Sequence, residues 1–305
     1  MTGVFDILQL YRDSAKIQRP LFTKCVALIC TGFLLQGCQS KPQETYFSKL
    51  SHNNWEIYKA TVGAPAENLT RYPANERFPD VSNITGDVVF SSDRKGSFNL
   101  YLMNREGRNL RPVSHSPFPD VSARWSPDGQ SLVFVSERHE RNENLYLLKP
   151  YTSQEPQRLT HHRAADYEPA WHPAGKLLVF LSERDERPEV YTLNLANEKM
   201  AQLTRNGFPK HAPAFSSDGK TLAYAQQEGQ QWKLVWGTLA ELQQNTARSS
   251  QAFDGVITDI KWLDAETLSY TNINRNTTAS LTFNIQTRQK TVYLEAVRER
   301  VQHLR

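Results

Sequence analysis

Cysteine is nearly absent from the sequence and is confined to one end of it. The chain has 305 residues but only three cysteines, Cys25, Cys30 and Cys38. A disulfide framework would distribute cysteines through the fold, and a zinc site would need further Cys or His residues at ligand spacing around them. The sequence meets neither condition, so we assign the three cysteines to one local feature.

The motifs of common catalytic and nucleotide-binding sites are also missing. The sequence has only 14 glycines, and none forms a Gly-x-Ser-x-Gly nucleophile motif, a phosphate-binding loop or a dinucleotide fingerprint. The net charge is +4, and the basic residues form no stripe or run, which argues against nucleic-acid binding. These absences predict a protein that is not an enzyme and has no nucleic-acid partner.

A short apolar run stands directly before Cys38. Residues 26–35 follow three basic residues between positions 16 and 24, and the run ends at Gln36-Gly37-Cys38. This order of basic, apolar and small residues is typical of a cleaved signal peptide, and the run is short for a membrane span. Leu35-Gln36-Gly37-Cys38 resembles a bacterial lipobox, in which the cysteine is acylated and becomes the mature N-terminus.

We therefore predict a signal peptide over residues 1–37, lipidation of Cys38, a tether over 38–45 and a folded domain over 46–305. Polar residues follow Cys38 at once, as a tether requires. They favour this prediction over an ordinary cleaved signal or a buried helix in a cytosolic protein. Gln39, where an aspartate would signal inner-membrane retention, favours the outer membrane, with the domain facing the periplasm.

The domain itself is built from an internal repeat. In each unit an aromatic residue closes a strand-like pattern, at spacings of 43, 45, 45, 45 and 47 residues; these are Tyr58, Tyr101, Tyr146, Tyr191, Trp236 and Phe283. A second aromatic lies 11 to 13 residues before each one: Phe47, Phe90, Phe134, Phe180, Tyr224 and Tyr270. Two series of six at one period indicate six copies of one unit.

Each unit reads as four short strands. Residues 123–125 end a first strand, and Ser126-Pro127-Asp128-Gly129 is a tight-turn sequence. Residues 131–135 form an apolar second strand that suits burial on both faces, residues 144–148 a third, and Arg158-Leu159-Thr160 ends a fourth. Four strands at a period near 45 residues predict an all-β, six-bladed propeller of four-stranded antiparallel blades.

The two ends of the repeat are irregular. Phe47 comes nine residues after Cys38, so the first unit lacks its first strand. Residues 295–301 run past the fourth strand of the last unit. They are interpreted either as a strand that completes the first blade and closes the ring or as a short amphipathic helix, with the strand favoured.

The repeat resembles the WD-like propeller repeat of the TolB family. Phe90-Ser91-Ser92-Asp93-Arg94 and Trp125-Ser126-Pro127-Asp128-Gly129 carry the resemblance, which spans residues 46–294. It implies a non-enzymatic propeller that binds or scaffolds cell-envelope proteins. TolB has an α/β domain before its propeller and is a soluble periplasmic protein. Here the predicted lipid anchor stands close to the first blade, and we expect a monomer.

Chemistry-bearing residues recur just before the first strands, where the loops of a propeller approach its central channel. They are His115 and Asp120, then His161, His162 and Asp166, then His211. Asp80, Asp120, Asp166 and His211 are candidates for partner or ligand binding at the channel mouth.

Asp80, Asp120 and Asp166 are interpreted as repeating in register, which also allows them a plain structural role in each blade. Arg94, Arg138 and Arg184 recur after acidic residues and are expected to tie the loop after the second strand to a neighbour.

An alternative function is a metal-dependent enzyme or sensor for a small acidic ligand in the channel. Imidazole is a suitable metal ligand, and the candidates are His115, His161, His162 and His211. Apart from such a channel metal ion, we predict no cofactor. A purely structural assembly factor is a third possibility that the sequence does not separate from partner binding.

Overall fold

The computed structural model describes residues 44–300, with gaps at 52, 62–63, 140, 245–248 and 274–276. The predicted signal peptide, Cys38 and residues 39–43 of the predicted tether lie outside the described residues. In the described part of the chain, no helix is both long and apolar enough to cross a membrane.

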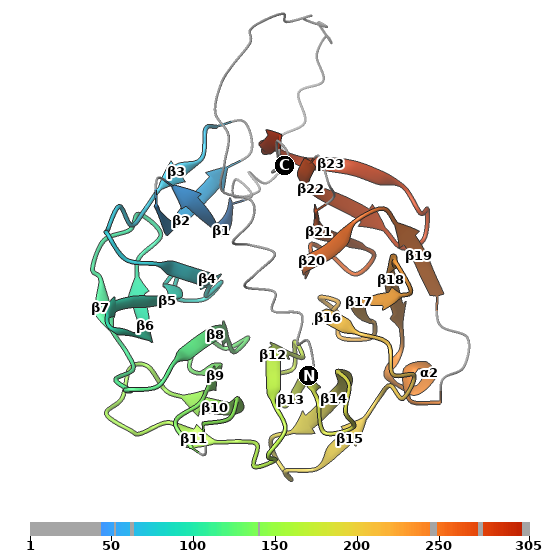
Figure 1. The fold of residues 1–305 in the computed structure, drawn as a ribbon, viewed down its shortest axis with the longest axis horizontal. Coiled ribbons are helices and arrows are strands. Elements are labelled where there is room, and N and C mark those ends of the chain that lie inside the picture. Colours follow the sequence, from blue (N-terminus) through green and yellow to red (C-terminus); the bar gives the residue numbers. More distant parts are fainter. Residues whose placement is uncertain are drawn as a thin grey trace, which may run out of the picture.

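Six antiparallel sheets stand around a central axis as the blades of a propeller (Figure 1). Five of them have four strands, and the first has three described strands. In each four-stranded blade the chain begins at the axis and moves outward one strand at a time (Figure 1). The predicted all-β, six-bladed propeller of four-stranded antiparallel blades is confirmed.

The blades follow one another along the chain. The first contains β1 (Glu44–Ser51), β2 (Asn54–Thr61) and β3 (Glu67–Asn68). The second contains β4 (Glu76–Val81), β5 (Val88–Lys95), β6 (Ser97–Met103) and β7 (Arg111–Pro112). The third contains β8 (Asp120–Trp125), β9 (Leu132–Ser136), β10 (Asn144–Leu148) and β11 (Gln157–Arg158).

The remaining three blades repeat this order. The fourth contains β12 (Asp166–Trp171), β13 (Leu177–Ser182), β14 (Glu189–Asn194) and β15 (Met200–Gln202). The fifth contains β16 (Lys210–Phe215), β17 (Leu222–Glu228), β18 (Gln231–Gly237), the short helix α2 (Leu239–Gln243) and β19 (Ser249–Phe253). The sixth contains β20 (Val256–Trp262), β21 (Thr267–Ile273), β22 (Thr277–Asn284) and β23 (Lys290–Arg300).

The connections lie on two opposite rims, because successive strands run antiparallel. We call the rim with the loops between second and third strands, and between blades, the upper rim. There the Asn142 amide donates a hydrogen bond to the His162 carbonyl at 2.9 Å, joining these two kinds of loop. The lower rim has the turns between first and second strands and between third and fourth strands.

The inner strand of every four-stranded blade is bulged at the same place. The register shifts within β4, β8, β12, β16 and β20. The third residue of each strand, or the fourth in the longer β20, has a positive φ between 50° and 57°: Phe78, Ser122, Glu168, Ala212 and Asp259. A bulge bends the strand and redirects a side chain, so each inner strand changes direction halfway along the channel.

Tight turns follow the inner strands, as predicted. In Ser126-Pro127-Asp128-Gly129, the glycine has φ +68°, and the Ser126 hydroxyl donates to the Asp128 carboxylate at 2.5 Å. A Cβ on Gly129 would lie 3.0 Å from the Ser82 hydroxyl and 3.1 Å from the Ile84 Cβ. Glycine is required here both by the left-handed backbone and by close contact with the preceding blade.

The paired aromatics mark the second and third strands of each blade except the first, in which they lie on β1 and β2. In the first four blades the two residues of a pair face each other across the strands, with ring centroids 5.7–6.0 Å apart. In the last two blades Tyr224 faces Val235 and Tyr270 faces Leu281. There the rings of Trp236 and Phe283 meet each other between blades, with centroids 5.5 Å apart.

The apolar core lies between neighbouring blades. One buried cluster joins Val89 and Leu100 of the second blade to Trp125, Leu132 and Phe134 of the third. Equivalent clusters join the third blade to the fourth and the fourth to the fifth. The middle strands are therefore covered on both faces, which explains their uninterrupted apolar sequences.

The C-terminal segment is a strand but does not complete the first blade. β23 extends to Arg300 and pairs with β22 of the sixth blade, with Arg300 opposite Thr277. The sequence-based expectation that this segment supplies the missing strand of the first blade is wrong for the described residues. A hairpin partner is close along the chain, so pairing with β22 closes a much shorter loop than pairing with the first blade would.

Candidate functional site

Two of the predicted binding residues, Asp120 and Asp166, are the first residues of inner strands and are fully buried. Asp120 accepts hydrogen bonds from the Arg138 guanidinium at 2.8 and 2.9 Å. Asp166 accepts two from Arg184, both at 3.2 Å. These arginines follow the second strand, so each pair ties an upper-rim loop to the inner strand of the same blade. Buried in these pairs, the two aspartates offer no surface to a partner.

The same position is occupied differently in the neighbouring blades. Glu76 pairs with Arg94 at 2.8 Å in the second blade. In the fifth blade the first residue of the inner strand is Lys210, which has the opposite charge. Its ammonium lies 2.8 Å from the carboxylate of Glu189 in the fourth blade, and both side chains are buried. An ion pair at the start of the inner strand thus persists through four blades, although its polarity and its partner change.

Asp80 does not belong to this series. It is the fifth residue of β4, four positions after Glu76. Its carboxylate accepts a hydrogen bond from the Trp125 backbone N–H at 2.8 Å and so joins the second blade to the third. The expectation that Asp80 repeats in register with Asp120 and Asp166 is wrong, because the equivalent acidic residue is a glutamate.

The predicted metal-binding histidines are not brought together. His115, His161 and His162 are exposed on loops between blades, and the His162 Nδ1 accepts a hydrogen bond from the Ala164 N–H at 3.1 Å. His211 is the second residue of β16. Among the described residues, no three His, Cys, Asp or Glu side chains are grouped so that they could hold a metal ion. The described channel therefore lacks the donor set that the metal-dependent alternative requires.

His211 instead belongs to a cluster of carboxylates. Its Nδ1 lies 3.3 Å from the Glu168 carboxylate, which also accepts a hydrogen bond from the Ala212 N–H at 2.5 Å. Glu168 has a positive φ of 50°, so the inner-strand bulge of the fourth blade directs its carboxylate toward the fifth. The His211 ring also packs against Trp232, with centroids 5.3 Å apart.

Further carboxylates extend this cluster toward the third blade. The Tyr167 hydroxyl donates a hydrogen bond to Glu183 at 3.2 Å, and burial together with neighbouring carboxylates raises the pKa of Tyr167. Burial also raises the pKa of Glu143 to about 7, and the negative charges of Glu137, Glu183 and Glu168 raise it further. We call Glu137, Glu143, Tyr167, Glu168, Glu183 and His211 the acidic mouth.

The acidic mouth combines three blades at the upper rim. Glu137 and Glu143 come from the loop between β9 and β10, Glu183 from the loop after β13, and Tyr167, Glu168 and His211 from inner strands. Sequence reasoning identified only His211. A signal for two others was present, because Glu137 and Glu183 both stand in a repeated Ser-Glu-Arg sequence, just before the arginines of the buried pairs.

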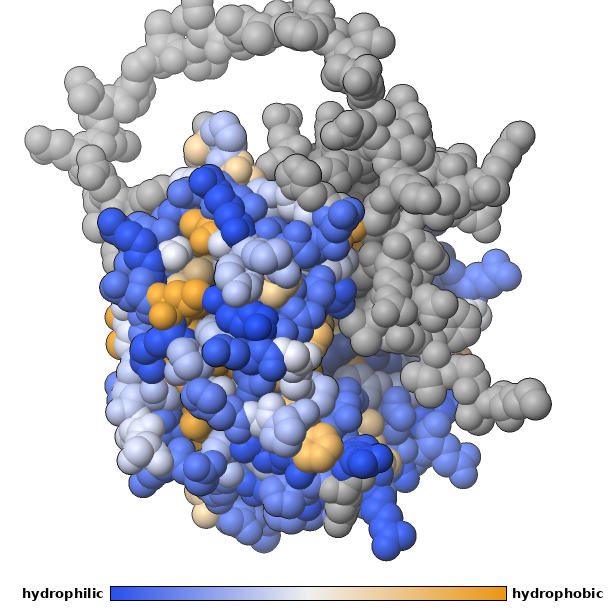
Figure 2. All heavy atoms as spheres, turned by 60° about the vertical axis from the view of Figure 1, so that its left-hand side comes forward, coloured by the Kyte–Doolittle hydropathy of each residue, from blue (hydrophilic) through white to orange (hydrophobic). Residues whose placement is uncertain are grey.

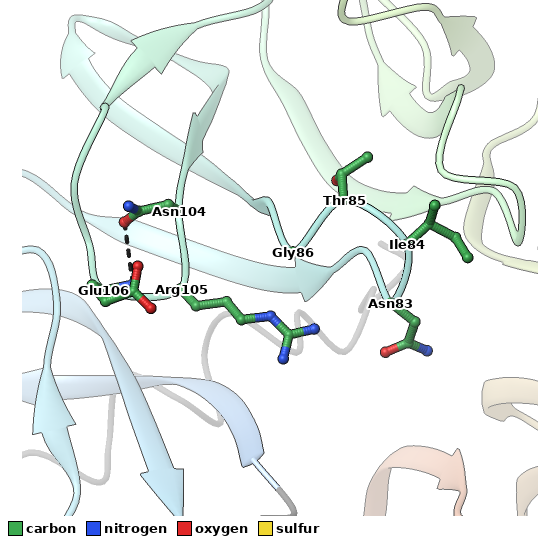
Figure 3. A pocket seen from close by; sticks show the side chains of 7 residues that line it. All are labelled: Asn83, Ile84, Thr85, Gly86, Asn104, Arg105 and Glu106. Atoms are coloured by element: carbon green, nitrogen blue, oxygen red, sulfur yellow. Dashed lines mark hydrogen bonds between the residues drawn. The ribbon is translucent and has the colours of Figure 1, made fainter. Parts of the chain in front are cut away.

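A cavity lies on the opposite rim. It has a volume of 370 Å³ and is lined by residues 83–86, between β4 and β5, and by residues 104–106, between β6 and β7. Figure 3 shows the Arg105 side chain extending along it toward Asn83. The cavity is open and lies away from the acidic mouth.

Comparison with known proteins agrees with this architecture. Residues 121–255 match the family model described as the TolB beta propeller domain. This part of the chain is similar to the propeller of TolB. TolB from Acinetobacter baumannii superposes with a TM-score of 0.68 at 18% identity, over 77% of this chain and 58% of that one. The TolB-like chain thus spans somewhat more than half the length of that relative.

Two other solved structures share the fold. An Agrobacterium tumefaciens protein provisionally named TolB has a TM-score of 0.64 at 13% identity, over 75% of this chain and 84% of its own. A puromycin-hydrolyzing peptidase from Mycobacterium tuberculosis has a TM-score of 0.58 at 14% identity, over 83% of this chain and 44% of its own. The same propeller fold therefore occurs in proteins named TolB and as part of a peptidase, and at these identities the likeness concerns the fold alone.

Replacing Arg138 by alanine should strongly destabilise the propeller. It leaves the carboxylate of Asp120 buried without its cation, which costs about 3–5 kcal/mol in comparable pairs. The control is Arg108→Ala, because the Arg108 side chain is 74% exposed, and its loss should change the free energy of unfolding by less than about 0.5 kcal/mol. Urea unfolding measures the free energy of unfolding of both variants. Similar small effects of the two variants would contradict a structural role for the pair.

Glu143 should make stability depend on pH. Its pKa is higher in the folded protein, about 7, than its ordinary value of 4.5. The folded state therefore holds the proton more tightly, and stability falls as the pH rises between these values. Glu143→Gln should raise the free energy of unfolding at pH 8 by about 1–3 kcal/mol and have little effect at pH 5.

Denaturant titrations at both pH values measure this difference. The control variant is Glu155→Gln, which changes an exposed glutamate on the lower rim. Its effect on the free energy of unfolding should be the same at pH 5 and pH 8. If the effect of Glu143→Gln is the same at pH 5 and pH 8, the carboxyl is not held protonated by its surroundings.

Proposed function

We propose that this TolB-like protein is a non-enzymatic, lipid-anchored component of the cell envelope whose propeller binds other envelope proteins through its upper rim. The observation that supports this best is the acidic mouth, which presents side chains of three successive blades at one place. A surface of this kind suits recognition of a protein segment, because contacts from several rigid elements are fixed relative to one another.

The architecture around the acidic mouth supplies this rigidity. The buried pairs Asp120–Arg138 and Asp166–Arg184 hold the two loops that contain Glu137, Glu143 and Glu183. Of the four residues that the sequence singled out for partner binding, Asp120 and Asp166 serve this support, and Asp80 joins two blades. His211 stays in the proposed binding surface, and the carboxylates around it replace the other three.

The charge of the acidic mouth defines the kind of partner. Burial is the largest cause of the raised pKa of Glu143, and the negative charges of Glu137, Glu183 and Glu168 raise it further. The second contribution supports a surface whose negative charge is only partly compensated. A partner with lysine or arginine side chains would supply the missing positive charge, and complementary charges favour both specificity and rapid association. The proposed ligand is therefore a basic segment of an envelope protein.

The proposed location follows from the sequence. The lipobox-like residues ending at Cys38 and the tether that follows would anchor the protein in the outer membrane with the propeller in the periplasm. The TolB-like fold supports an envelope role.

Reversing charge in the acidic mouth should abolish partner binding. Glu137→Lys with Glu183→Lys should reduce recovery of the partner from solubilised envelopes by about tenfold or more, an effect of about 1.4 kcal/mol or more in binding. The measurement is affinity purification with quantitative mass spectrometry, compared with an unrelated propeller as bait. The matched control, Glu106→Lys with Glu155→Lys, reverses two exposed charges on the lower rim.

Three outcomes are informative for this proposal. Loss of one partner set in the upper-rim variant alone supports it. Equal loss in both variants contradicts the assignment to the upper rim. Failure to recover any partner that the control bait does not also recover contradicts the binding function itself.

Cys38 should carry the lipid. Metabolic labelling with palmitate should mark the wild-type protein and the variants Cys25→Ala and Cys30→Ala, and the label should disappear in Cys38→Ala. The two control variants remove the other cysteines of the chain. Retention of label in Cys38→Ala would refute the anchor.

A further inference from the structure

The described chain begins on the lower rim. Glu44 is the first residue of β1 and pairs with Thr61. Its carboxylate lies 3.4 Å from the guanidinium of Arg105, in the lower-rim turn between β6 and β7. The lower rim is therefore the side on which residues before 44 join the propeller.

The distance to the predicted anchor is short. Cys38 precedes Glu44 by only six residues, which span at most about 20 Å when fully extended. An eight-residue strand such as β1 rises by about 26 Å along the blade. A lipid on Cys38 can therefore hold the lower rim at a membrane, whereas the upper rim lies too far away to face the same membrane.

The lower rim near this point exposes apolar side chains. Ile84, between β4 and β5, is 66% exposed and is the most exposed of the large apolar residues described. Leu110 and Tyr151, on lower-rim connections of the second and third blades, are each 45% exposed. Figure 2 shows the side of the molecule that these blades form, where apolar residues are separate patches in a mostly hydrophilic surface. The apolar side chains are thus few and suit shallow contact with a bilayer rather than a protein core.

Basic side chains lie beside these apolar ones. Arg105, Arg108 and Arg111 occur within seven residues of the chain. The Arg108 side chain is 74% exposed, and its guanidinium lies 3.9 Å from the exposed carboxylate of Glu106. The Arg111 guanidinium lies over the Tyr151 ring, 5.5 Å from its centroid. Arginine next to exposed aromatic and aliphatic residues is the composition that binds the interface of an anionic bilayer.

We propose that the lower rim of the first three blades lies against the lipid surface and that the upper rim faces away from it. This inference rests on the lipid anchor in the proposed function. The orientation keeps the acidic mouth more than a Debye length of about 8 Å from anionic head groups, which would otherwise repel its carboxylates. It also leaves the proposed binding surface open to partners in the aqueous compartment.

The orientation can be measured with single-cysteine probes on the full-length protein. No cysteine follows Cys38, so a cysteine introduced into the propeller is the only labelling site there. Ile84→Cys reports on the lower rim. Phe208→Cys is the matched upper-rim probe, because Phe208 is an apolar residue exposed to 37% in the connection between the fourth and fifth blades.

Each variant is labelled with a fluorophore and reconstituted with its lipid into vesicles of phosphatidylethanolamine and phosphatidylglycerol that contain spin-labelled lipid. Quenching of the Ile84→Cys probe should be several-fold stronger than quenching of the Phe208→Cys probe. Adding Arg105→Ser and Arg108→Ser to Ile84→Cys should reduce the difference in quenching between the lower-rim and upper-rim probes.

The anchor and the orientation are separated by fractionating Cys38→Ala in parallel. If this variant leaves the membrane but both probes are quenched equally, or the upper-rim probe more strongly, the orientation is wrong and the anchor stands. If Cys38→Ala stays in the membrane fraction, the anchor and the orientation that depends on it both fail.

Discussion

The ion pair between the first residue of an inner strand and the arginine after the second strand holds the upper rim together. Asp120 and Asp166 are fully buried, so each carboxylate needs its guanidinium as compensation for lost solvation. This requirement fixes the two upper-rim loops that begin with Glu137 and Glu183, because those residues immediately precede the arginines. The proposed binding surface is thus placed by a structural interaction directly beneath it.

The inner-strand bulge is the second constraint on the site. In the inner strand of each of the five four-stranded blades, one residue adopts a positive φ, which bends the strand and redirects that side chain. The residue at this position is not conserved in type between blades: it is glutamate in the fourth blade and alanine in the fifth. The repeated backbone geometry therefore gives each blade a different group near the axis, and the fourth blade uses it for Glu168. One surface can thus become acidic while the scaffold remains regular.

The two rims divide the proposed roles of the protein. The upper rim gathers carboxylates from three blades around His211, whereas the lower rim has Ile84, exposed arginines and the point where the chain enters at Glu44. Opposite rims arise because an antiparallel blade places its alternate connections on opposite sides. In the proposed arrangement, a short tether holds one rim at the membrane and leaves the other rim free for a partner.

The sequence by itself determined the fold, because the period of the aromatic pairs and the turn after each inner strand are local features that repeat. It did not determine which strand residues 295–300 pair with, because strand pairing depends on chain entropy and packing as well as on the sequence pattern. It also placed Asp80 at the position of Asp120 and Asp166, because the three residues are of the same type. The strand register instead places Glu76 at that position. Only the tertiary structure decided which acidic residues are buried in ion pairs and which gather at the acidic mouth. Burial and proximity depend on neighbouring blades, and these are about 45 residues away in the chain.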